Sequence, residues 1–130
     1  MIAVDTSALI AILTAEPQAR PCLAALQSAS EALISAGTVA EALVVAAGRN
    51  VIDDMLNLID ALPLRVVEVT PETARRVGRI YAKWGKGLDP AGLNFGDCFA
   101  YDVAREHSCP LLFVGNDFAK TDLESALEAD

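Results

Sequence analysis

Four short runs of apolar or β-branched residues recur along this chain, separated by longer segments with helical spacing. Apolar runs of this length, without polar alternation, predict strands buried on both faces of a parallel sheet. The predicted strands are Ile2–Val4, Ala32–Ser35, Arg65–Val69 and Pro110–Val114. All four are short, so the predicted sheet is small.

The segments between these runs predict helices, several of which have residues at their ends that favour capping. Thr38 and Glu41 have the spacing of a capping box, Asn50 is placed to cap the next helix, and Thr70 is followed by a proline. A glycine-rich stretch, 85–94, predicts a loop. The predicted helices are Ser7–Thr14, Gln18–Ser28, Thr38–Ala47, Val51–Ala61, Thr70–Trp84, Gly96–His107 and an acidic tail, Asp122–Ala129.

This alternation of strands and helices predicts an α/β fold. We expect a three-layer α/β/α sandwich with a short central parallel sheet, formed by one domain over residues 1–130. Right-handed crossovers place the carboxyl ends of all strands at the same edge. Because open sheets of this kind bind ligands at that edge, the search for functional residues begins there.

Composition narrows the classes of protein that this chain can represent. Of its 130 residues, 53% are hydrophobic, which argues against a disordered chain. No apolar run approaches the roughly 20 residues of a membrane span, and the N-terminus lacks the basic region of a signal peptide. Three cysteines without metal-site spacing favour reduced thiols, so we expect a cytoplasmic protein. A net charge of −8 means that a polyanion could bind only through a basic patch or bound cations.

Four acidic residues stand at or just beyond the predicted carboxyl ends of the strands. Asp5 ends the first strand, Glu41 and Asp97 lie in the first turns of helices, and Asp117 follows the fourth strand. Each alone could be a cap or turn residue. Together, with no lysine or arginine beside them, they would repel one another, and a divalent cation would remove that repulsion. Asp122 is an alternative fourth acid, but Asp117 is nearer the strand end.

Such a site suits phosphodiester cleavage, and the residues around it resemble a known family. The stretches 1–9, 96–101 and 115–118, together with Glu41, are similar to PIN-domain ribonucleases, in particular to the VapC-type toxins of bacterial toxin–antitoxin pairs. The resemblance extends over essentially the whole chain.

The resemblance implies a divalent-metal-dependent endoribonuclease that cleaves RNA and is paired with a cognate antitoxin protein. It implies a Mg²⁺ site, with Mn²⁺ as a possible substitute, formed by Asp5, Glu41, Asp97 and Asp117. Asp5 and Asp97 would bind the metal most directly, while Glu41 and Asp117 would complete the site and help to activate water. Ser7, Thr38 and Asn116 are candidates to support these acids, although capping already accounts for Thr38.

Other polar features have an ordinary alternative beside the functional one. Asp102 lies about 140° around the helix from Asp97, so we expect it to face solvent or a partner. Arg75, Arg79 and Lys83 share a helix face that could position the RNA backbone or simply be solvated.

The alanine-rich segments, Ala19–Ala29 and Ala40–Ala47, could bury a homodimer interface, accept an antitoxin segment, or pack in the core.

Two further functions remain open at this point. The chain could be a catalytically silent PIN-like binding module, or another Mg²⁺-dependent phosphotransfer protein such as a receiver or phosphatase. The absence of a second aspartate two residues after Asp5 argues against the phosphatase.

Overall fold

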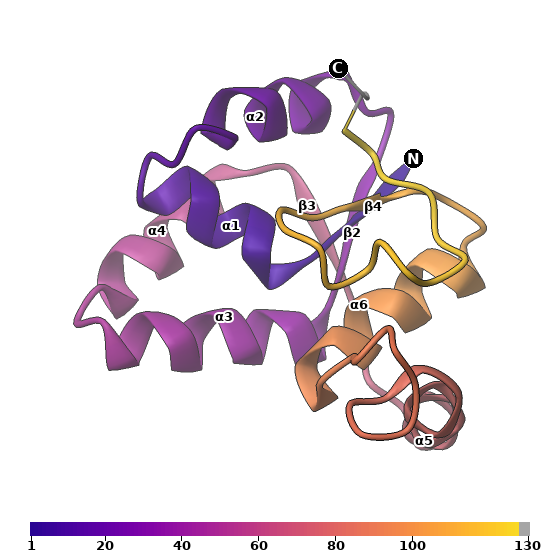
Figure 1. Cartoon of the computed structure of the whole chain (residues 1–130). Helices are drawn as coiled ribbons and strands as arrows, with labels where there is room; N and C mark the ends of the chain where they lie inside the picture. The colour runs from indigo at the N-terminus through magenta and orange to yellow at the C-terminus, as the bar shows by residue number, and fades with distance from the viewer. Residues whose placement is uncertain (128–130) are drawn as a thin grey trace.

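The computed structural model describes residues 1–127 and contains one parallel sheet with the strand order β3-β2-β1-β4 (Figure 1). The sequence predicted all four strands, although β3 begins and ends slightly earlier than expected and β4 is shorter. Leu33 pairs with Arg65 across β2 and β3, and Ala3 pairs with Leu111 across β1 and β4. The strands are β1 (Ile2–Val4), β2 (Ala32–Ser35), β3 (Leu64–Val67) and β4 (Leu111–Leu112).

Six helices of the described chain connect and cover these strands, and their bounds lie within two residues of those predicted. None of these helices is both long enough and apolar enough to cross a membrane. In Figure 1, α5 and α6 lie together, away from α1 and α2. The helices are α1 (Thr6–Leu13), α2 (Ala19–Ser28), α3 (Ala36–Gly48), α4 (Ile52–Ala61), α5 (Pro71–Trp84) and α6 (Phe95–Glu106).

The sheet separates two hydrophobic clusters, because successive strand residues point to opposite faces. One face packs against α5 and α6 and includes Ala3, Leu33 and Leu111. The other packs against α1 to α4 and includes Val4, Ile34 and Leu112. This burial on both faces confirms the three-layer α/β prediction.

The strand order creates a crevice beside β1. From β1 the chain proceeds to β2 and β3 on one side, whereas β4 pairs with the other side of β1. Such a switch in direction opens a crevice at the carboxyl ends of the strands. Asp5, the residue after β1, therefore lies where this topology favours a ligand.

Two predicted helix starts are wrong in detail. The side chain of Ser35 accepts a hydrogen bond from the Gly37 N–H (3.1 Å), so α3 begins directly after β2 and Thr38 lies inside it. The predicted Thr38–Glu41 capping box does not form. Asn50 adopts a left-handed conformation (φ 58°) in the turn after α3, and the N-cap position of α4 is Val51.

The acidic tail was predicted to be helical, and in residues 122–127 that prediction is wrong. The Leu111 N–H donates to the carbonyl of Glu124 (2.9 Å), and the Ala126 N–H donates to the carbonyl of Leu111 (2.8 Å). The tail therefore pairs with the outer side of β4, whose backbone groups need partners. The last residues of the predicted helix, 128 and 129, lie outside the described residues.

Candidate functional site

A pocket of about 410 Å³ opens at the carboxyl ends of β1 and β4. Its lining comes from α1, α3, the start of α6 and the segment after β4. The four acids that the sequence singled out all line it: Asp5, Glu41, Asp97 and Asp117. The fold thus gathers four carboxylates from distant parts of the chain around one cavity, named below the acidic pocket.

Asp5 is buried, with only 4% of its surface exposed, and it caps α1. Its Oδ2 accepts hydrogen bonds from the Ser7 N–H (3.0 Å) and the Ser7 hydroxyl (2.6 Å). The Ser7 Oγ in turn accepts a hydrogen bond from the Val114 N–H (3.0 Å), which joins this corner to the end of β4. The other carboxylate oxygen, Oδ1, is buried and has no hydrogen-bond partner among residues 1–127. Ser7 therefore holds Asp5, and one oxygen of Asp5 is left for a ligand.

Glu41 is held by a residue that the sequence analysis did not select. The Thr6 hydroxyl donates to Glu41 Oε1 (2.5 Å), joining the first turn of α1 to α3. Gly96 lies so close that a Cβ at this position would overlap the Glu41 carboxylate. The sequence signal for Thr6 was its position as the hydroxyl residue directly after the strand-ending aspartate.

Asp97 is fixed by a reciprocal capping box at the start of α6. The Asp97 N–H donates to the Asn94 Oδ1 (2.8 Å), and the Asn94 N–H donates to the Asp97 Oδ2 (3.0 Å). Only 5% of Asp97 is exposed. Asn94 also lines the acidic pocket. The sequence analysis missed Asn94, although an asparagine three residues before an aspartate is itself a signal for this cap.

The remaining predicted residues differ in how close they lie to the acidic pocket. Asp117 is exposed on the segment after β4, beyond Gly115, whose φ of 96° favours glycine. Asn116 is exposed and is not part of the pocket lining. Thr38 is fully buried and is not part of the pocket lining; its carbonyl accepts a hydrogen bond from the Thr6 hydroxyl (3.4 Å), and its own hydroxyl has no partner among the described residues.

Burial and mutual repulsion make two of these carboxylates hard to ionise. Burial raises the pKa of Asp5 from 3.8 to about 6; the charge of Glu41 adds to this rise, and hydrogen bonds from Ser7 oppose it. Burial raises the pKa of Asp97 to about 7; the Asn94 hydrogen bond opposes this, and the charges of Asp5, Asp117 and Glu41 add to it. Such shifts are typical of sites that bind a cation or transfer protons.

One basic side chain lines the acidic pocket, contrary to the expectation that none would lie beside the acids. Arg49 stands at the C-cap of α3, two helical turns beyond Glu41. Within residues 1–127, neither Arg49 nor any other basic residue forms an ion pair with the four carboxylates. The cluster therefore remains uncompensated.

The acidic pocket fits a divalent cation by the chemistry of its donors. Four carboxylates with hard oxygen atoms line it, and the buried Asp5 Oδ1 lacks a hydrogen-bond partner in the described part of the chain. As the side chains stand, no three acidic, histidine or cysteine residues in 1–127 are close enough together to hold a metal ion. Hydrogen bonds to Ser7, Thr6 and Asn94 hold three of the acids. Coordination would therefore require these side chains to move toward one another.

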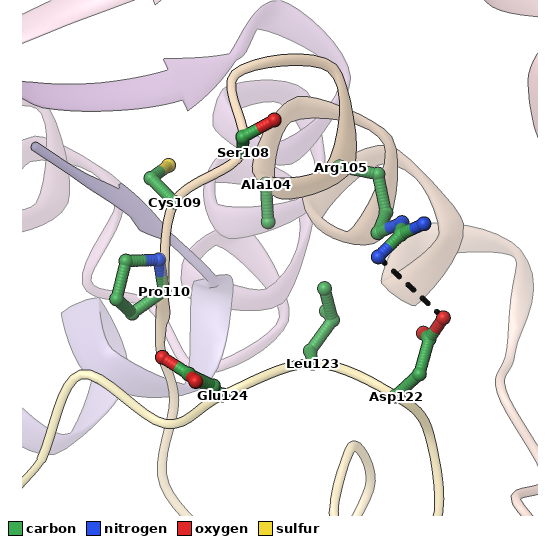
Figure 2. Close-up of a pocket in the computed structure, with 8 residues that line it drawn as sticks. All are labelled: Ala104, Arg105, Ser108, Cys109, Pro110, Asp122, Leu123 and Glu124. Carbon is green, nitrogen blue, oxygen red and sulfur yellow. Dashed lines mark ion pairs between the residues drawn. The ribbon is translucent and has the colours of Figure 1, made fainter.

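Asp122, the alternative fourth acid, belongs to a different pocket (Figure 2). There it forms an ion pair with Arg105 (3.6 Å), drawn as a dashed line, and accepts a hydrogen bond from the Tyr101 hydroxyl (2.7 Å). Cys109 lines the same pocket, and burial raises the pKa of its thiol, which disfavours the reactive thiolate. Asp117, rather than Asp122, therefore accompanies the other three acids.

Asp102 is not solvated, so that prediction is wrong. It is 4% exposed, and the Arg76 guanidinium donates to both of its carboxylate oxygens (2.6 and 3.1 Å). The helical geometry did correctly place it away from the acidic pocket. On that side of α6 lies α5, which supplies the arginine.

The basic face of α5 remains a prediction. Arg75, Arg79 and Lys83 are all exposed, and none lines the acidic pocket. Trp84, next to them, donates to the Tyr101 hydroxyl (3.1 Å) and packs against the core.

The alanine-rich helices have two different environments. Ala42 and Ala46 of α3 are fully buried in the core, as ordinary packing predicts. Ala24 and Ala25 of α2 instead line a groove of about 600 Å³ with Leu127. An antitoxin or dimer contact at these helices stays a prediction.

Comparison with known proteins places this chain in a family. The PIN domain family model matches residues 2–124. The chain is similar to ribonuclease VapC36 of Mycobacterium tuberculosis, with 42% identity over 127 residues, covering 93% of this chain and 90% of that protein. It is also similar to ribonuclease VapC28 of the same organism, with 41% identity over 129 residues and coverage of 96% and 97%.

Solved structures share the fold at low sequence identity. M. tuberculosis VapC20, described as a toxin that cleaves the sarcin–ricin loop, has a TM-score of 0.78 at 16% identity, covering 98% of this chain and all of that one. A toxin–antitoxin complex from Klebsiella pneumoniae has a TM-score of 0.71 at 18% identity, with coverage of 99% and 100%. The chain belongs to the PIN domain family and, within it, to the VapC ribonucleases. The resemblance seen in the sequence is confirmed.

Proposed function

We propose that this chain is a divalent-metal-dependent endoribonuclease, the toxin of a toxin–antitoxin pair, with its metal held by Asp5, Glu41, Asp97 and Asp117. One observation carries the assignment to this pocket. The Asp5 Oδ1 is buried without a partner in a cavity lined by three further carboxylates. Leaving a buried carboxylate oxygen unpaired costs stability, so a ligand that satisfies it is expected.

The chain's own residues prepare the acidic pocket for this role. Ser7 holds one oxygen of Asp5. Thr6 sets the position of Glu41, and Asn94 fixes Asp97 through its backbone N–H. Asp5 and Asp97 are the most direct ligands in this proposal, with Glu41 and Asp117 completing the set and orienting water. When bound, the cation would neutralise charge on the scissile phosphate and favour deprotonation of the attacking water.

Mg²⁺ is the cation that we propose, with Mn²⁺ able to replace it, since both prefer carboxylate oxygens. Neutralisation by such a cation also allows a chain with a net charge of −8 to accept RNA. Two similarities support an antitoxin partner: the VapC relatives and the toxin–antitoxin complex with the same fold. A homodimer in the cytoplasm completes the proposal.

The test compares two aspartates of the acidic pocket with one outside it. Asp5→Asn and Asp97→Asn each remove a carboxylate charge while preserving shape, and Asp54→Asn makes the same change at an exposed position of α4. Single-stranded RNA is incubated with each purified variant and Mg²⁺. We expect cleavage to fall at least about 100-fold in the two pocket variants and to be unchanged in the control. Retained Mg²⁺-dependent cleavage in both pocket variants would refute the assignment.

Two measurements separate this function from the alternatives. Calorimetric titration with Mn²⁺ should show binding that Asp97→Asn weakens; a wild-type chain that binds no Mn²⁺ would favour a silent binding module. Incubation with a small acyl phosphate should leave Asp5 unlabelled. Labelling there would instead favour a phosphotransfer protein.

A further inference from the structure

The acidic pocket extends beyond its four carboxylates, along two helices that pack against each other, α1 and α3 (Figure 1). Residues four positions apart share a helix face, and each helix contributes such a row to the lining. The row on α1 includes Thr6 and Ile10, and the row on α3 is Glu41, Val45 and Arg49. At a rise of about 1.5 Å per residue, Arg49 follows Glu41 by roughly 12 Å along the α3 axis. The pocket therefore leads from the acids, past apolar side chains, to an arginine.

Arg49 is the only one of the chain's ten lysines and arginines that lines this pocket. Its side chain is exposed, and it forms no ion pair with any carboxylate of residues 1–127, although Glu16 and Glu41 line the same pocket. The Glu16 carboxylate instead accepts a hydrogen bond from the Thr14 hydroxyl (2.8 Å). The Arg49 guanidinium can therefore reach a ligand in the pocket without first breaking an ion pair within the described chain.

The chemistry of a guanidinium suits it to one part of an RNA strand. Its planar fork donates paired hydrogen bonds to a phosphate, and it stays charged at any physiological pH. Contacts of this kind position a nucleic acid without reading its sequence. Because the metal-binding acids lie about two helical turns away, the phosphate that Arg49 reaches is not the one at the metal.

We propose that Arg49 binds a backbone phosphate of the RNA next to the one being cleaved, and so holds the strand along α3; this rests on the ribonuclease function proposed above. In an acidic chain, such a contact supplies positive charge at the place where the substrate needs it. The same arginine could instead stabilise the C-terminal end of α3 or offset the charge of the acids. Those two roles would affect protein stability and metal binding rather than the affinity for RNA.

The experiment removes this charge and compares it with an equal change elsewhere. RNA cleavage in Mg²⁺ is measured for Arg49→Ala, Arg49→Lys and the control Arg20→Ala. Arg20 is exposed on α2, does not line the acidic pocket and has no ion pair within residues 1–127, so its loss changes the net charge equally.

We expect KM to rise about tenfold to 100-fold in Arg49→Ala with little change in kcat, because the contact is the same in the substrate and in the transition state. Arg49→Lys should recover part of this loss, since lysine keeps the charge and loses the paired hydrogen bonds. Arg20→Ala should stay close to the wild type.

Binding provides a readout independent of cleavage. In an Asp97→Asn background, the Kd of a single-stranded oligoribonucleotide is measured over a range of salt concentrations. Arg49→Ala should reduce the slope of log Kd against log salt by about 0.7, the value for one phosphate contact on a single strand. A neutral methylphosphonate linkage is then moved along the oligonucleotide. At one position it should weaken binding about tenfold when Arg49 is present and have little effect in Arg49→Ala.

Several results would overturn the phosphate contact. KM could be unchanged in Arg49→Ala, or kcat could fall alone, which would assign Arg49 to the reacting phosphate. Mn²⁺ affinity or the urea midpoint of Arg49→Ala could fall along with RNA affinity, which would give Arg49 a structural role. The methylphosphonate could have the same effect with and without Arg49 at every position. A wild type that cleaves no RNA in Mg²⁺ would instead contradict the ribonuclease function, and the oligonucleotide binding would then decide the Arg49 contact separately.

Discussion

Two buried aspartates on the same helix show opposite ways of keeping a carboxylate inside this protein. Asp97 and Asp102 are five residues apart on α6 and are 5% and 4% exposed. Both oxygens of Asp102 accept hydrogen bonds from Arg76. Asp97 has only a backbone cap and three acidic neighbours, and its pKa is raised to about 7. At equal burial, one carboxylate is neutralised within the fold and the other is not.

This difference agrees with the proposal that Asp102 serves the fold and that Asp97 serves a ligand. A carboxylate that only stabilises the fold gains most from a cation such as Arg76. A buried carboxylate without such a cation lowers the stability of the unliganded protein. That stability is regained only when a cation binds. Changes at the two aspartates, or at their partners, should therefore have measurable effects on stability as well as on activity.

The largest expected effect is on the stability of the metal-free protein as pH rises. The folded-state pKa of Asp97 (about 7) and of Asp5 (about 6) lie above their ordinary 3.8, so folding favours the protonated acids. The unfolded chain releases these protons first, and stability falls as pH rises through this range. We expect a loss of roughly 3 kcal/mol or more between pH 5 and pH 8 in EDTA, measured by urea unfolding.

Two controls connect this loss to the acidic pocket. Asp97→Asn should flatten the pH profile, because asparagine does not titrate. Adding Mn²⁺ at pH 8 should restore the stability of the wild type. The same addition should raise the stability of Asp97→Asn much less. A metal-free protein that is as stable at pH 8 as at pH 5 would contradict the picture of uncompensated acids.

The next effect concerns the compensated partner. Arg76→Ala leaves Asp102 buried without its cation, and we expect a loss of about 2–3 kcal/mol in the free energy of unfolding, since the Arg76 side chain is itself one-third exposed. Arg75→Ala, at the exposed neighbouring position, should cost less than about 0.5 kcal/mol. Equal losses in the two variants would show that the Asp102 pair contributes nothing. RNA cleavage per folded molecule should be unchanged in Arg76→Ala, because Arg76 does not line the acidic pocket.

A smaller effect is expected where α6 meets α3. A methyl group at position 96 would overlap the Glu41 carboxylate and displace it from Thr6, whereas a Cβ at Gly78 meets nothing. Gly96→Ala should therefore reduce cleavage about tenfold, equivalent to about 1.4 kcal/mol, with little loss of stability because alanine favours helix. Gly78→Ala should leave cleavage unchanged. Full activity in Gly96→Ala would show that Glu41 need not occupy its observed position.

The smallest effect is that of a single hydroxyl. Thr6→Val keeps the shape of the side chain and removes its hydrogen bond to Glu41. We expect a loss of about 1 kcal/mol in unfolding experiments and a few-fold weaker binding of Mn²⁺, measured by calorimetry. If Mn²⁺ affinity does not change, Thr6 serves the fold alone.

The sequence predicted the architecture well because the strands and helices have strong local patterns. Short, mainly apolar runs identified β1 and β2 with their observed bounds, and Thr70 with Pro71 marked the start of α5. Side-chain pairs between different elements were harder to predict from the sequence. The Arg76–Asp102 pair joins residues 26 positions apart, and nothing in the spacing of either residue indicates the other.

Part of the acidic pocket could also be predicted, because the strand ends were recognisable from the local sequence pattern. Asp5 and Asp117 follow strands, so topology alone places them at one edge. Thr6 and Arg49 depend on side-chain reach across elements, which is why they were missed. Asn94 acts locally, three residues before Asp97, and its capping signal was overlooked. The tail was assigned to a helix on composition, but the open backbone edge of β4 determined its conformation.

The hydroxyl of Ser7 has a consequence that extends beyond Asp5. It donates to the Asp5 carboxylate and accepts from the Val114 N–H, three residues before Asp117. A single oxygen atom thus ties the opening residues of the chain to the segment that carries the last acid. The positions of two carboxylates that are more than a hundred residues apart in the sequence thus depend in part on the same hydroxyl group.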